Sequence, residues 1–366
     1  MVTPSVEPVA SGPTYSMTNL AKNLAENKSI DFKLITFDFF GDTKNKLPYE
    51  LRFKLTGRKG YGFSYDFIKF LINEFKKPSK VIIYNNSQYY LHSISIFVLR
   101  IFYKFVLVFS PRGSLDEVSL KNTGRVFIKR VLLKPYLLLL STIDYLICTS
   151  KMEVNTVKKY FPNKEIFLLP NSTDPPKNIT SSKKNIFLYL GRLIPQKGIH
   201  DLINAWDDGL ASAKGWELWI AGPPSNLEYF ESLKELSSNS TSIKFVGEVS
   251  GEMKWSIINM SKFLVLPSYS ENFGNVVIEG MICGSVPITT SDIPWEELNE
   301  YSVGFSSERK DLPGIIKLAM EMENSKYIDL SNRTKKYAEQ NYHAKKVSLR
   351  LVDYFYSLGK GNTNEQ

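Results

Sequence analysis

Short apolar runs rich in β-branched and aromatic residues alternate with longer segments of helical periodicity along most of the chain. Such alternation is typical of parallel sheets that helices cover on both faces. The expected strands are Lys33–Phe37, Val81–Tyr84, Phe105–Phe109, Tyr145–Thr149, Ile166–Leu169, Ile186–Leu190, Glu217–Ala221, Ile243–Val246, Phe263–Leu266 and Val286–Thr289. Expected helices include Thr14–Glu26, Ser64–Glu74, Ile199–Trp206, Leu227–Ser237 and Asn275–Cys283. The pattern therefore predicts an α/β protein built on doubly wound parallel sheets.

A stretch rich in Pro, Ser and Asn interrupts this alternation between Pro170 and Lys184, and it is typical of an interdomain linker. It divides the chain into two predicted domains, 1–175 and 185–340, and a C-terminal helix at about 343–358 is expected to pack back on the first. Ligands of doubly wound sheets bind beyond the carboxyl ends of the strands, so a cleft between the two domains is the expected site.

The start of the first domain leaves two alternatives open. A first parallel strand should precede the loop at Ser11–Pro13, but only Met1–Ser5 is available for it. Either this strand is short, or the recorded start lies several residues downstream of the natural one.

Composition excludes several classes of protein. With 366 residues, 43% hydrophobic and 23% charged, the chain is long enough for two ordinary domains and is not a disordered tail, a fibre or a small disulfide scaffold. Two cysteines, Cys148 and Cys283, and three histidines cannot form a zinc cluster at the usual spacing. Both cysteines lie in apolar runs, which indicates core residues in a reducing compartment.

No segment of the sequence has the pattern of a membrane span or a signal peptide. The longest apolar stretches, Ile94–Phe109 and Val131–Ile147, both contain charged residues and fall short of the roughly 20 apolar residues that a span requires. The first residues lack a basic segment leading into an apolar one. These patterns predict a cytosolic protein.

Charge is distributed unevenly. Residues 1–180 carry 26 Lys and Arg against 14 Asp and Glu, a net charge of +12, and the rest carries 20 against 23, a net charge of −3. A basic half of this kind favours an anionic partner, which could be a nucleic acid, a phospholipid surface or a phosphorylated substrate. For any single lysine, simple solvation is an equally good explanation.

The segment from Leu266 to Gly284 reads as a strand, a loop and a helix that begins near Asn275. The backbone amides of Phe273, Gly274 and Asn275 would point outward at the helix start, where the helix dipole favours an anion. Glu271 lies in the loop and Glu279 lies one turn into the helix, so both can face one pocket. Taken alone, the segment favours the simpler explanation, in which Glu279 is a solvated helix residue and Glu271 compensates the helix dipole.

A second segment, from Phe187 to Gly198, reads as a strand that runs into Gly191 and a tight turn. Arg192 and Lys197 flank this turn. Two fixed cations at the carboxyl end of a strand suit a diphosphate, because Arg offers a planar fork of donors and Lys a point charge. In isolation, two basic loop residues would be solvated.

Together these segments resemble retaining glycosyltransferases of the GT-B architecture, the large family that includes sucrose synthase and bacterial polysaccharide mannosyltransferases. The resemblance covers nearly the whole chain and implies two Rossmann-like domains facing a central cleft. It rests on Glu271-x(7)-Glu279, Gly191-Arg192 and Gln196-Lys197-Gly198, with support from Trp219-Ile-Ala-Gly222-Pro, Phe245-Val-Gly247, Gly284-Ser-Val-Pro287-Ile, Leu169-Pro-Asn171, Ser110-Pro-Arg-Gly-Ser and Cys148-Thr-Ser150.

The resemblance implies roles for these residues. Arg192 and Lys197 would act in catalysis by holding the donor diphosphate, and Glu271 would contact the donor sugar. Glu279 would bind the nucleotide ribose, and Gly191 with the segment Asn272, Phe273, Gly274 and Asn275 would surround the donor. The loop at Gly12 would approach the same phosphates, because glycine permits a close backbone approach.

The resemblance also implies transfer of a glycosyl group from a nucleotide-sugar to a hydroxyl, with retention of the anomeric configuration. The group is expected to be a hexose. An oxocarbenium-like transition state needs a stabilised leaving diphosphate, which fixed cations can supply in place of a metal. The sequence has no Asp-x-Asp pair of the kind that holds a metal–diphosphate. We therefore expect no metal and no other cofactor.

In the first domain, His92 falls near where family members often place an active-site histidine. The sequence departs from the family there, since Asn and Tyr replace a common His-x-His pair, and a packed or helix-capping histidine is equally consistent. Arg112, after a strand in Ser110-Pro-Arg-Gly, is the better donor-binding candidate, because the glycine beside it allows tight packing at a strand end.

A basic amphipathic segment, Ser119–Leu140, suits an anionic membrane surface or a polyprenyl-diphosphate-linked acceptor. Lys121, Arg125, Lys129 and Arg130 carry this expectation; solvated lysines on a core helix are the alternative. This property would be needed by a cytoplasmic enzyme that is peripheral on the inner face of the membrane. Such an enzyme would add sugar to a lipid-linked or oligosaccharide acceptor in the synthesis of O-antigen, capsule or exopolysaccharide.

Three other functions deserve comparison. A nucleic-acid-binding protein is prompted by the pI of 9.1, but no recognition motif is present. A nucleotide-dependent oxidoreductase would carry Gly-x-Gly-x-x-Gly after a strand, and none occurs. A non-catalytic transferase-like subunit is disfavoured by the intact Glu pair and cations. The sequence does not identify the sugar, the linkage or the oligomeric state. UDP is the favoured nucleotide and GDP the alternative, and the base is expected to contact the chain near Val246–Val249.

Overall fold

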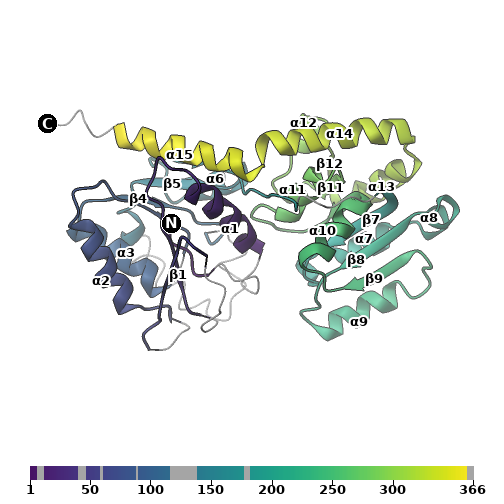
Figure 1. Cartoon of the computed structure of the whole chain (residues 1–366). Coiled ribbons are helices and arrows are strands. Elements are labelled where there is room, and N and C mark those ends of the chain that lie inside the picture. Colours follow the sequence, from purple (N-terminus) through teal and green to yellow (C-terminus); the bar gives the residue numbers. More distant parts are fainter. Residues whose placement is uncertain are drawn as a thin grey trace. The chain divides into compact units, whose positions relative to one another are not determined.

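The structure is a computed structural model that describes residues 1–5, 12–39, 47–57, 61–87, 90–115, 138–176 and 182–360. It divides into two compact units (Figure 1). The first comprises Met1–Ser172 together with Ala344–Gln366, and the second comprises Thr173–His343. Each unit is a parallel sheet with helices on both faces.

The sheet of the first unit is completed by the first few residues. Strand β1 (Leu34–Phe37) pairs in parallel with β2 (Glu50–Phe53). A second set of parallel strands has the order β3 (Ile82–Asn85), β4 (Val106–Phe109), β5 (Tyr145–Cys148), β6 (Ile166–Leu168). Val2 bridges the two sets, pairing in parallel with both Ile35 and Asn85. Val2 thus lies between the two sets as an isolated bridge, at the place where a first strand was expected.

Helices cover both faces of this sheet because successive strand residues point to opposite sides. Leu107 and Phe109 of β4 pack into a cluster with α2 (Tyr65–Phe75) and α3 (Leu91–Phe102). Val108 packs on the other face with α1 (Gly12–Ala25) and α15 (Ala344–Lys360). A further helix, α6 (Lys151–Lys158), starts at Ser150, whose Oγ accepts from the Glu153 amide at 3.1 Å.

In the second unit the strand order is β12-β11-β10-β7-β8-β9, all parallel. The first strand in sequence, β7, therefore lies in the middle: the chain winds outward on one side, then returns and winds outward on the other. The point where the order reverses lies between β7 and β10, and this is where doubly wound sheets bind ligands. The strands are β7 (Lys184–Leu190), β8 (Glu217–Ala221), β9 (Ile243–Gly247), β10 (Ser261–Leu266), β11 (Val286–Thr290) and β12 (Phe305–Ser307).

The connections of the second unit are mostly helical. Phe187 and Tyr189 pack into the cluster on one face of the sheet, and Leu188 and Leu190 pack into the cluster on the other. The helices and 3₁₀ turns are η3 (Pro195–Lys197), α7 (Ile199–Ala205), α8 (Asp208–Lys214), α9 (Leu227–Leu236), α10 (Gly251–Met260), α11 (Asn275–Ile282), α12 (Glu297–Glu300), η4 (Arg309–Asp311), α13 (Leu312–Glu321) and α14 (Asn324–Asn341).

Every expected strand is present within two residues of its predicted bounds, but β2 and β12 were not predicted. Their sequences, Glu-Leu-Arg-Phe and Phe-Ser-Ser, lack an apolar run. Glu50 of β2 is buried nonetheless and accepts hydrogen bonds from Arg52 Nε at 2.8 Å and from the Leu47 amide at 3.0 Å. Among the helices that the structure describes, none is long and apolar enough to cross a bilayer.

A partly buried lysine immediately before β7 predicts how the stability of the second unit depends on pH. Lys183 Nζ donates to the Ser261 carbonyl and to Ser285 Oγ, both at 2.8 Å, and burial lowers its pKa from 10.5 to about 7. Between pH 7 and 10.5 the unfolded chain therefore binds more protons than the folded one, so the unfolding free energy rises with pH across this window.

Lys183→Met should remove that rise, which we expect to be on the order of 5 kcal/mol in the wild type. Urea unfolding followed by tryptophan fluorescence reports on this unit, because all five tryptophans lie between Trp206 and Trp295. Lys317→Met, at an exposed site on α13, is the control. If the unfolding free energy of Lys183→Met rose with pH as steeply as that of the wild type, the prediction would be contradicted.

Candidate active site

The loops that follow β7 and β10 meet at the reversal point of the sheet in the second unit. The Tyr269 amide in the second loop donates to the Gln196 carbonyl in the first at 2.9 Å. Gly198 has a left-handed φ of 64°, and a Cβ placed on it would lie 2.2 Å from the Pro267 carbonyl oxygen. Only glycine allows this contact, so Gly198 permits the close approach of the two loops.

The end of β7 is packed equally tightly on its other side. A Cβ on Gly222, which has a φ of 142°, would lie 1.8 Å from the Gly191 carbonyl oxygen. The Gly191 amide donates to the Ala221 carbonyl at 3.0 Å, so the strand pairing of β7 and β8 extends to Gly191. Gly198 and Gly222 are therefore both required by the proximity of neighbouring backbone.

Lys197 and Glu271, predicted from separate motifs, form an ion pair between Nζ and Oε1. Their side chains are 19% and 14% exposed. Ser268 Oγ donates to the same carboxylate oxygen at 2.9 Å. The sheet order brings them together, since Lys197 ends the turn after β7 and Glu271 lies in the loop after the adjacent strand β10.

Arg192 lies on the same loop as Lys197, and its side chain is exposed. Its backbone carbonyl accepts from the hydroxyl of the buried Tyr189 at 2.9 Å. This bond holds the backbone of the loop while the guanidinium stays available to solvent.

The start of α11 is fixed by backbone and ring contacts. Gly274 caps the helix with a φ of 81°, and the carbonyl of the buried Phe273 accepts a hydrogen bond from Trp295 Nε1 at 2.6 Å. The Phe273 and Trp295 rings pack edge-on with centroids 5.2 Å apart. Asn275 opens the helix, after Asn272 and Phe273 in the loop. The first amides of a helix have no intrahelical partner, and they favour an anion.

Glu279 lies on the buried face of α11, with 5% of its surface exposed. The interpretation of Glu279 as a solvated helix residue is therefore wrong. Lys254 of α10 donates from Nζ to its Oε1 at 2.6 Å. Burial raises the pKa of the Glu279 carboxyl, and the charge of Lys254 opposes this rise. Sequence reasoning missed Lys254, whose only local signal is a lysine in the first turn of a helix.

In the first unit, Arg112 has an unusual left-handed φ of 47°. Its Nε donates to Asn86 Oδ1 at 2.9 Å and its Nη1 to Asn171 Oδ1 at 2.7 Å. These bonds fix the guanidinium beside the carboxyl ends of β3 and β4. Gly12, the other donor-binding candidate of this unit, is the first residue of α1.

His92 is completely buried at the start of α3. Its ring stacks on Phe37 with centroids 3.9 Å apart, and its Nδ1 lies 2.9 Å from the Gly62 carbonyl oxygen. Burial lowers its pKa to about 3, so the ring is neutral at physiological pH. These are the features of the packed histidine, one of the two alternatives; the catalytic role stays a prediction.

The basic residues Lys121, Arg125, Lys129 and Arg130 lie outside the described residues. Within the described residues, no group of three or more His, Cys, Asp or Glu side chains is arranged to hold a metal ion.

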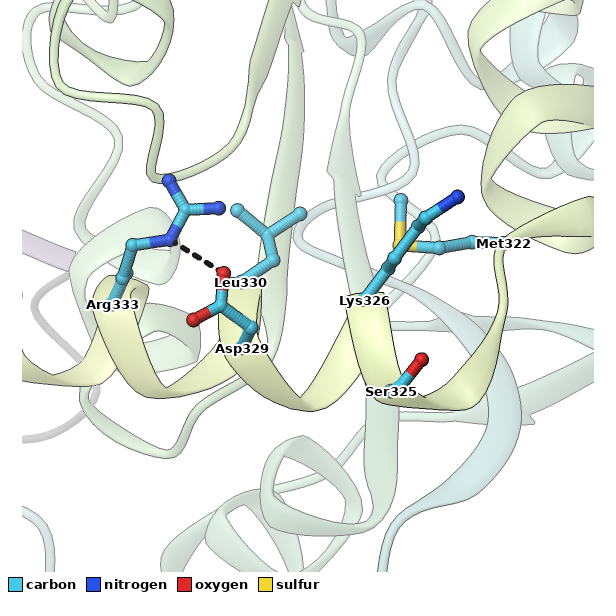
Figure 2. Close-up of a pocket in the computed structure, with 6 residues that line it drawn as sticks. All are labelled: Met322, Ser325, Lys326, Asp329, Leu330 and Arg333. Atoms are coloured by element: carbon cyan, nitrogen blue, oxygen red, sulfur yellow. Dashed lines mark hydrogen bonds and ion pairs between the residues drawn. The ribbon is translucent and has the colours of Figure 1, made fainter.

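An open hollow of about 480 Å³ lies along α14, away from these residues in sequence (Figure 2). It is lined by Met322, Ser325, Lys326, Asp329, Leu330 and Arg333. None of the predicted site residues lines it. Arg333 pairs with Asp329 one helical turn earlier at 3.1 Å and donates to the Ser302 carbonyl at 2.8 Å, which makes it a useful control below.

The sequence of this chain is similar to those of known proteins. The family model described as "Glycosyl transferases group 1" matches residues 152–341. An uncharacterized glycosyltransferase of Methanocaldococcus jannaschii, MJ1178, is 28% identical over 298 residues, which cover 77% of this chain and 76% of the relative.

Solved structures share the fold. HepE of Anabaena, in complex with UDP and glucose, has a TM-score of 0.69 at 16% identity and covers 97% of this chain and 98% of its own. WaaG, a glycosyltransferase involved in lipopolysaccharide biosynthesis, has a TM-score of 0.67 at 13% identity. The match covers 96% of this chain and 98% of WaaG. These matches confirm the predicted α/β fold of the GT-B class.

Proposed function

Because this chain belongs to the group 1 glycosyltransferases and so transfers sugar from a nucleotide-sugar, we propose that it moves a hexose from a UDP-sugar to a hydroxyl with retained configuration and without a metal. The observation that carries the proposal is the meeting of Lys197, Glu271 and the start of α11 at the reversal point of the sheet.

The donor diphosphate would bind to Lys197, Arg192 and the first amides of α11. The diphosphate gains negative charge as its bond to the sugar breaks, so fixed cations and amides stabilise the transition state more than the ground state. Arg192 is exposed on the same loop, where its planar fork suits phosphate oxygens. Two cations and a helix start can together serve where other enzymes use a divalent ion.

Glu271 would change partner when the donor binds. Without donor its carboxylate pairs with Lys197 and accepts from Ser268 Oγ at 2.9 Å. A diphosphate competes for Lys197 with more negative charge, which leaves Glu271 to accept from hydroxyls of the donor sugar. The Ser268 bond would keep the carboxylate oriented during this exchange.

Glu279 would bind the ribose. A buried carboxylate is a good acceptor for two neighbouring hydroxyls, provided that it is ionised. Lys254, 2.6 Å away, favours the ionised form against the effect of burial. Lys254 would thus support nucleotide binding by maintaining the charge of Glu279.

UDP is the favoured nucleotide, with GDP as the alternative. HepE, which shares the fold, is described in complex with UDP and glucose. The base would lie near Val246–Val249, after β9. Gly247, with a φ of 82°, accepts from the Gly222 amide at 2.7 Å, which fixes the backbone at this strand end.

The acceptor is proposed to be lipid-linked or an oligosaccharide, on an anionic membrane surface, in the synthesis of a bacterial surface polysaccharide. One face of α3 supports the membrane part of this proposal: Val98, Ile101 and Phe102 are 38%, 62% and 74% exposed. Residues 1–180 also carry a net charge of +12. An exposed apolar stripe on a basic unit suits an anionic lipid surface.

Calorimetric titration of the purified protein with UDP, GDP and ADP in EDTA tests the donor site. We expect UDP to bind without metal, and Glu279→Ala and Lys197→Ala each to weaken the affinity at least tenfold, while Arg333→Ala leaves it unchanged. Binding of none of the three nucleotides would overturn the proposal in favour of a non-catalytic subunit. A requirement for Mg²⁺ would refute metal independence.

Cosedimentation with vesicles tests the membrane surface. Phosphatidylglycerol vesicles should bind the protein and phosphatidylcholine vesicles should not. Replacing both Ile101 and Phe102 with serine should reduce the bound fraction at least threefold. Leu227→Ser is the matched control, because Leu227 is equally exposed, at 73%, on the second unit. Equal binding by all variants would refute a role of α3.

A further inference from the structure

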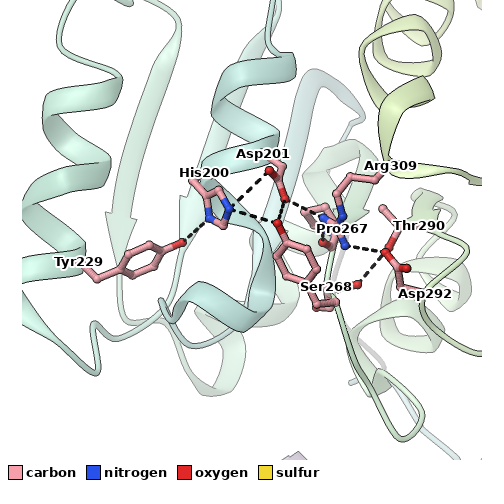
Figure 3. Close-up of polar contacts among 9 residues, drawn as sticks. His200, Asp201, Tyr229, Pro267, Ser268, Thr290, Asp292 and Arg309 are labelled. Atoms are coloured by element: carbon pink, nitrogen blue, oxygen red, sulfur yellow. Dashed lines mark hydrogen bonds and ion pairs between the residues drawn. The ribbon is translucent and has the colours of Figure 1, made fainter. Parts of the chain in front are cut away.

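Arg309, in the short turn η4, is the centre of a polar network that no sequence motif pointed to (Figure 3). Its Nη1 donates to the Pro267 carbonyl at 2.7 Å and to Asp201 Oδ2 at 2.8 Å. Its Nη2 donates to Asp292 Oδ2 at 2.7 Å. The guanidinium carbon lies 3.7 Å from the centre of the Tyr269 ring. One side chain thus contacts the loop after β10, helix α7 and the segment after β11.

The contacts converge on the loop that carries Glu271. Tyr269 donates from its hydroxyl to Asp201 Oδ2 at 2.8 Å, and His200 stacks on the Tyr269 ring with centroids 6.0 Å apart. The bond to Asp201 raises the pKa of Tyr269, so the hydroxyl stays protonated and keeps donating. The Ser268 carbonyl accepts from Thr290 Oγ1 at 3.0 Å (Figure 3). Residues 267–269 are therefore held on both their backbone and their side chains.

The same network reaches the loop that carries Lys197. Asp201 lies in the first turn of α7, three residues after Gly198. A Cβ on Gly198 would lie 2.9 Å from Arg309 Nη1 as well as 2.2 Å from the Pro267 carbonyl oxygen. Arg309 therefore packs against the point where the two loops touch. By bonding both Pro267 and Asp201, Arg309 connects the loop after β10 to the start of α7, in addition to the Lys197–Glu271 ion pair and the Tyr269–Gln196 bond.

An arginine is required for these contacts. A planar guanidinium can serve three acceptors and lie flat on an aromatic ring at once, whereas a lysine ammonium is a point charge without a flat face. The two carboxylates of Asp201 and Asp292 compensate its charge, so it does not compete with Lys197 for Glu271.

We propose that Arg309 is a positioning residue, which fixes the loop 267–271 and through it holds Glu271 in register with Lys197. Its effect on sugar transfer rests on the proposed function; its effect on the order of the loop does not. The two effects are measured separately.

Hydrogen exchange measures the order of the loop without any donor. Arg309→Ala should increase exchange at least tenfold in peptides that contain Tyr269, whose amide bonds to Gln196, and leave strand β8 unchanged. Arg309→Lys, the variant more certain to fold, should increase exchange in the same peptides. Arg333→Ala, which removes an arginine with one ion pair and one carbonyl contact on α14, should change none of them. Unchanged exchange around Tyr269 in both Arg309 variants would overturn the proposal.

Donor hydrolysis measures whether Arg309 acts through Glu271. With whichever of UDP-glucose, UDP-galactose or UDP-N-acetylglucosamine the wild type hydrolyses, Arg309→Ala should lower kcat about tenfold. In a Glu271→Gln background the same substitution should lower it less than twofold. An equal loss in both backgrounds would reveal a merely structural role and overturn the proposal. The proposed function is judged by nucleotide binding; if the wild type hydrolyses none of the donors, hydrogen exchange alone decides the role of Arg309.

Discussion

Replacing Lys197 with alanine is expected to lower the rate of glycosyl transfer by about 10²–10³-fold, which corresponds to about 3–4 kcal/mol of transition-state stabilisation. The physical reason is the position of the ammonium. Lys197 Nζ is held beside Glu271 in a side chain only 19% exposed, where solvent screens its charge less than at the open surface. A donor diphosphate that takes the place of Glu271 would meet this cation as its leaving-group charge develops.

Initial rates of nucleoside diphosphate release, with saturating donor, measure this loss. Lys234→Ala is the matched control, because Lys234 also pairs with a glutamate, at 3.0 Å from Glu231, but on the exposed surface of α9. It should retain full activity, since surface ion pairs contribute little. A Lys197→Ala enzyme that keeps more than a tenth of the wild-type rate would refute the assignment of Lys197 to the leaving group.

Gly198→Ala is expected to lower the unfolding free energy of the second unit by about 3 kcal/mol. Two costs combine. A left-handed backbone, here with a φ of 64°, costs an L residue about 1–2 kcal/mol. The added Cβ would also lie 2.2 Å from the Pro267 carbonyl oxygen, which no real contact allows, so the loop at Pro267 must move. That movement would carry Glu271 away from Lys197, so activity should fall more than stability alone explains.

Gly215→Ala separates the two costs. Gly215 has nearly the same φ, 68°, at the end of α8, and a Cβ there would meet no atom within 4 Å. The Gly215→Ala variant should lose only about 1 kcal/mol of unfolding free energy and keep its activity. Urea unfolding followed by tryptophan fluorescence compares the two variants. If Gly198→Ala and Gly215→Ala lost equal amounts of unfolding free energy, the close contact with Pro267 would make no contribution to the cost of the substitution.

The predicted strands agree with the structure because parallel strands buried on both faces must be continuously apolar. Leu188 and Tyr189 of β7, for example, are both fully buried, on opposite faces of the sheet. The same rule explains why β2 and β12 were missed. A short strand such as Glu50–Phe53 can bury polar groups when neighbours satisfy them, as Arg52 and Leu47 do for Glu50, and no local pattern records this.

The candidate site could be predicted only in part. Glycines with positive φ or a close backbone contact, such as Gly198 and Gly222, are visible in the sequence as motif positions, because no other residue fits there. Glu271 and Lys197 could be named as candidates but not as partners. Lys254 and Arg309 could not be named, since each acts on a residue that is remote in sequence, Glu279 in one case and the loop at Pro267 in the other.

By itself, then, the sequence determined the alternation of strands and helices, the positions of the glycine turns and the family to which the chain belongs, because these depend on burial and backbone conformation within a few neighbouring residues. Only the tertiary structure decided which charges pair. The sheet order places β10 beside β7, and so joins Glu271 to Lys197 across 74 residues. Burial of one face of α11 turned Glu279 toward Lys254. Ion pairing and desolvation depend on distance in space, and this distance is set by how the strands are ordered in the sheet.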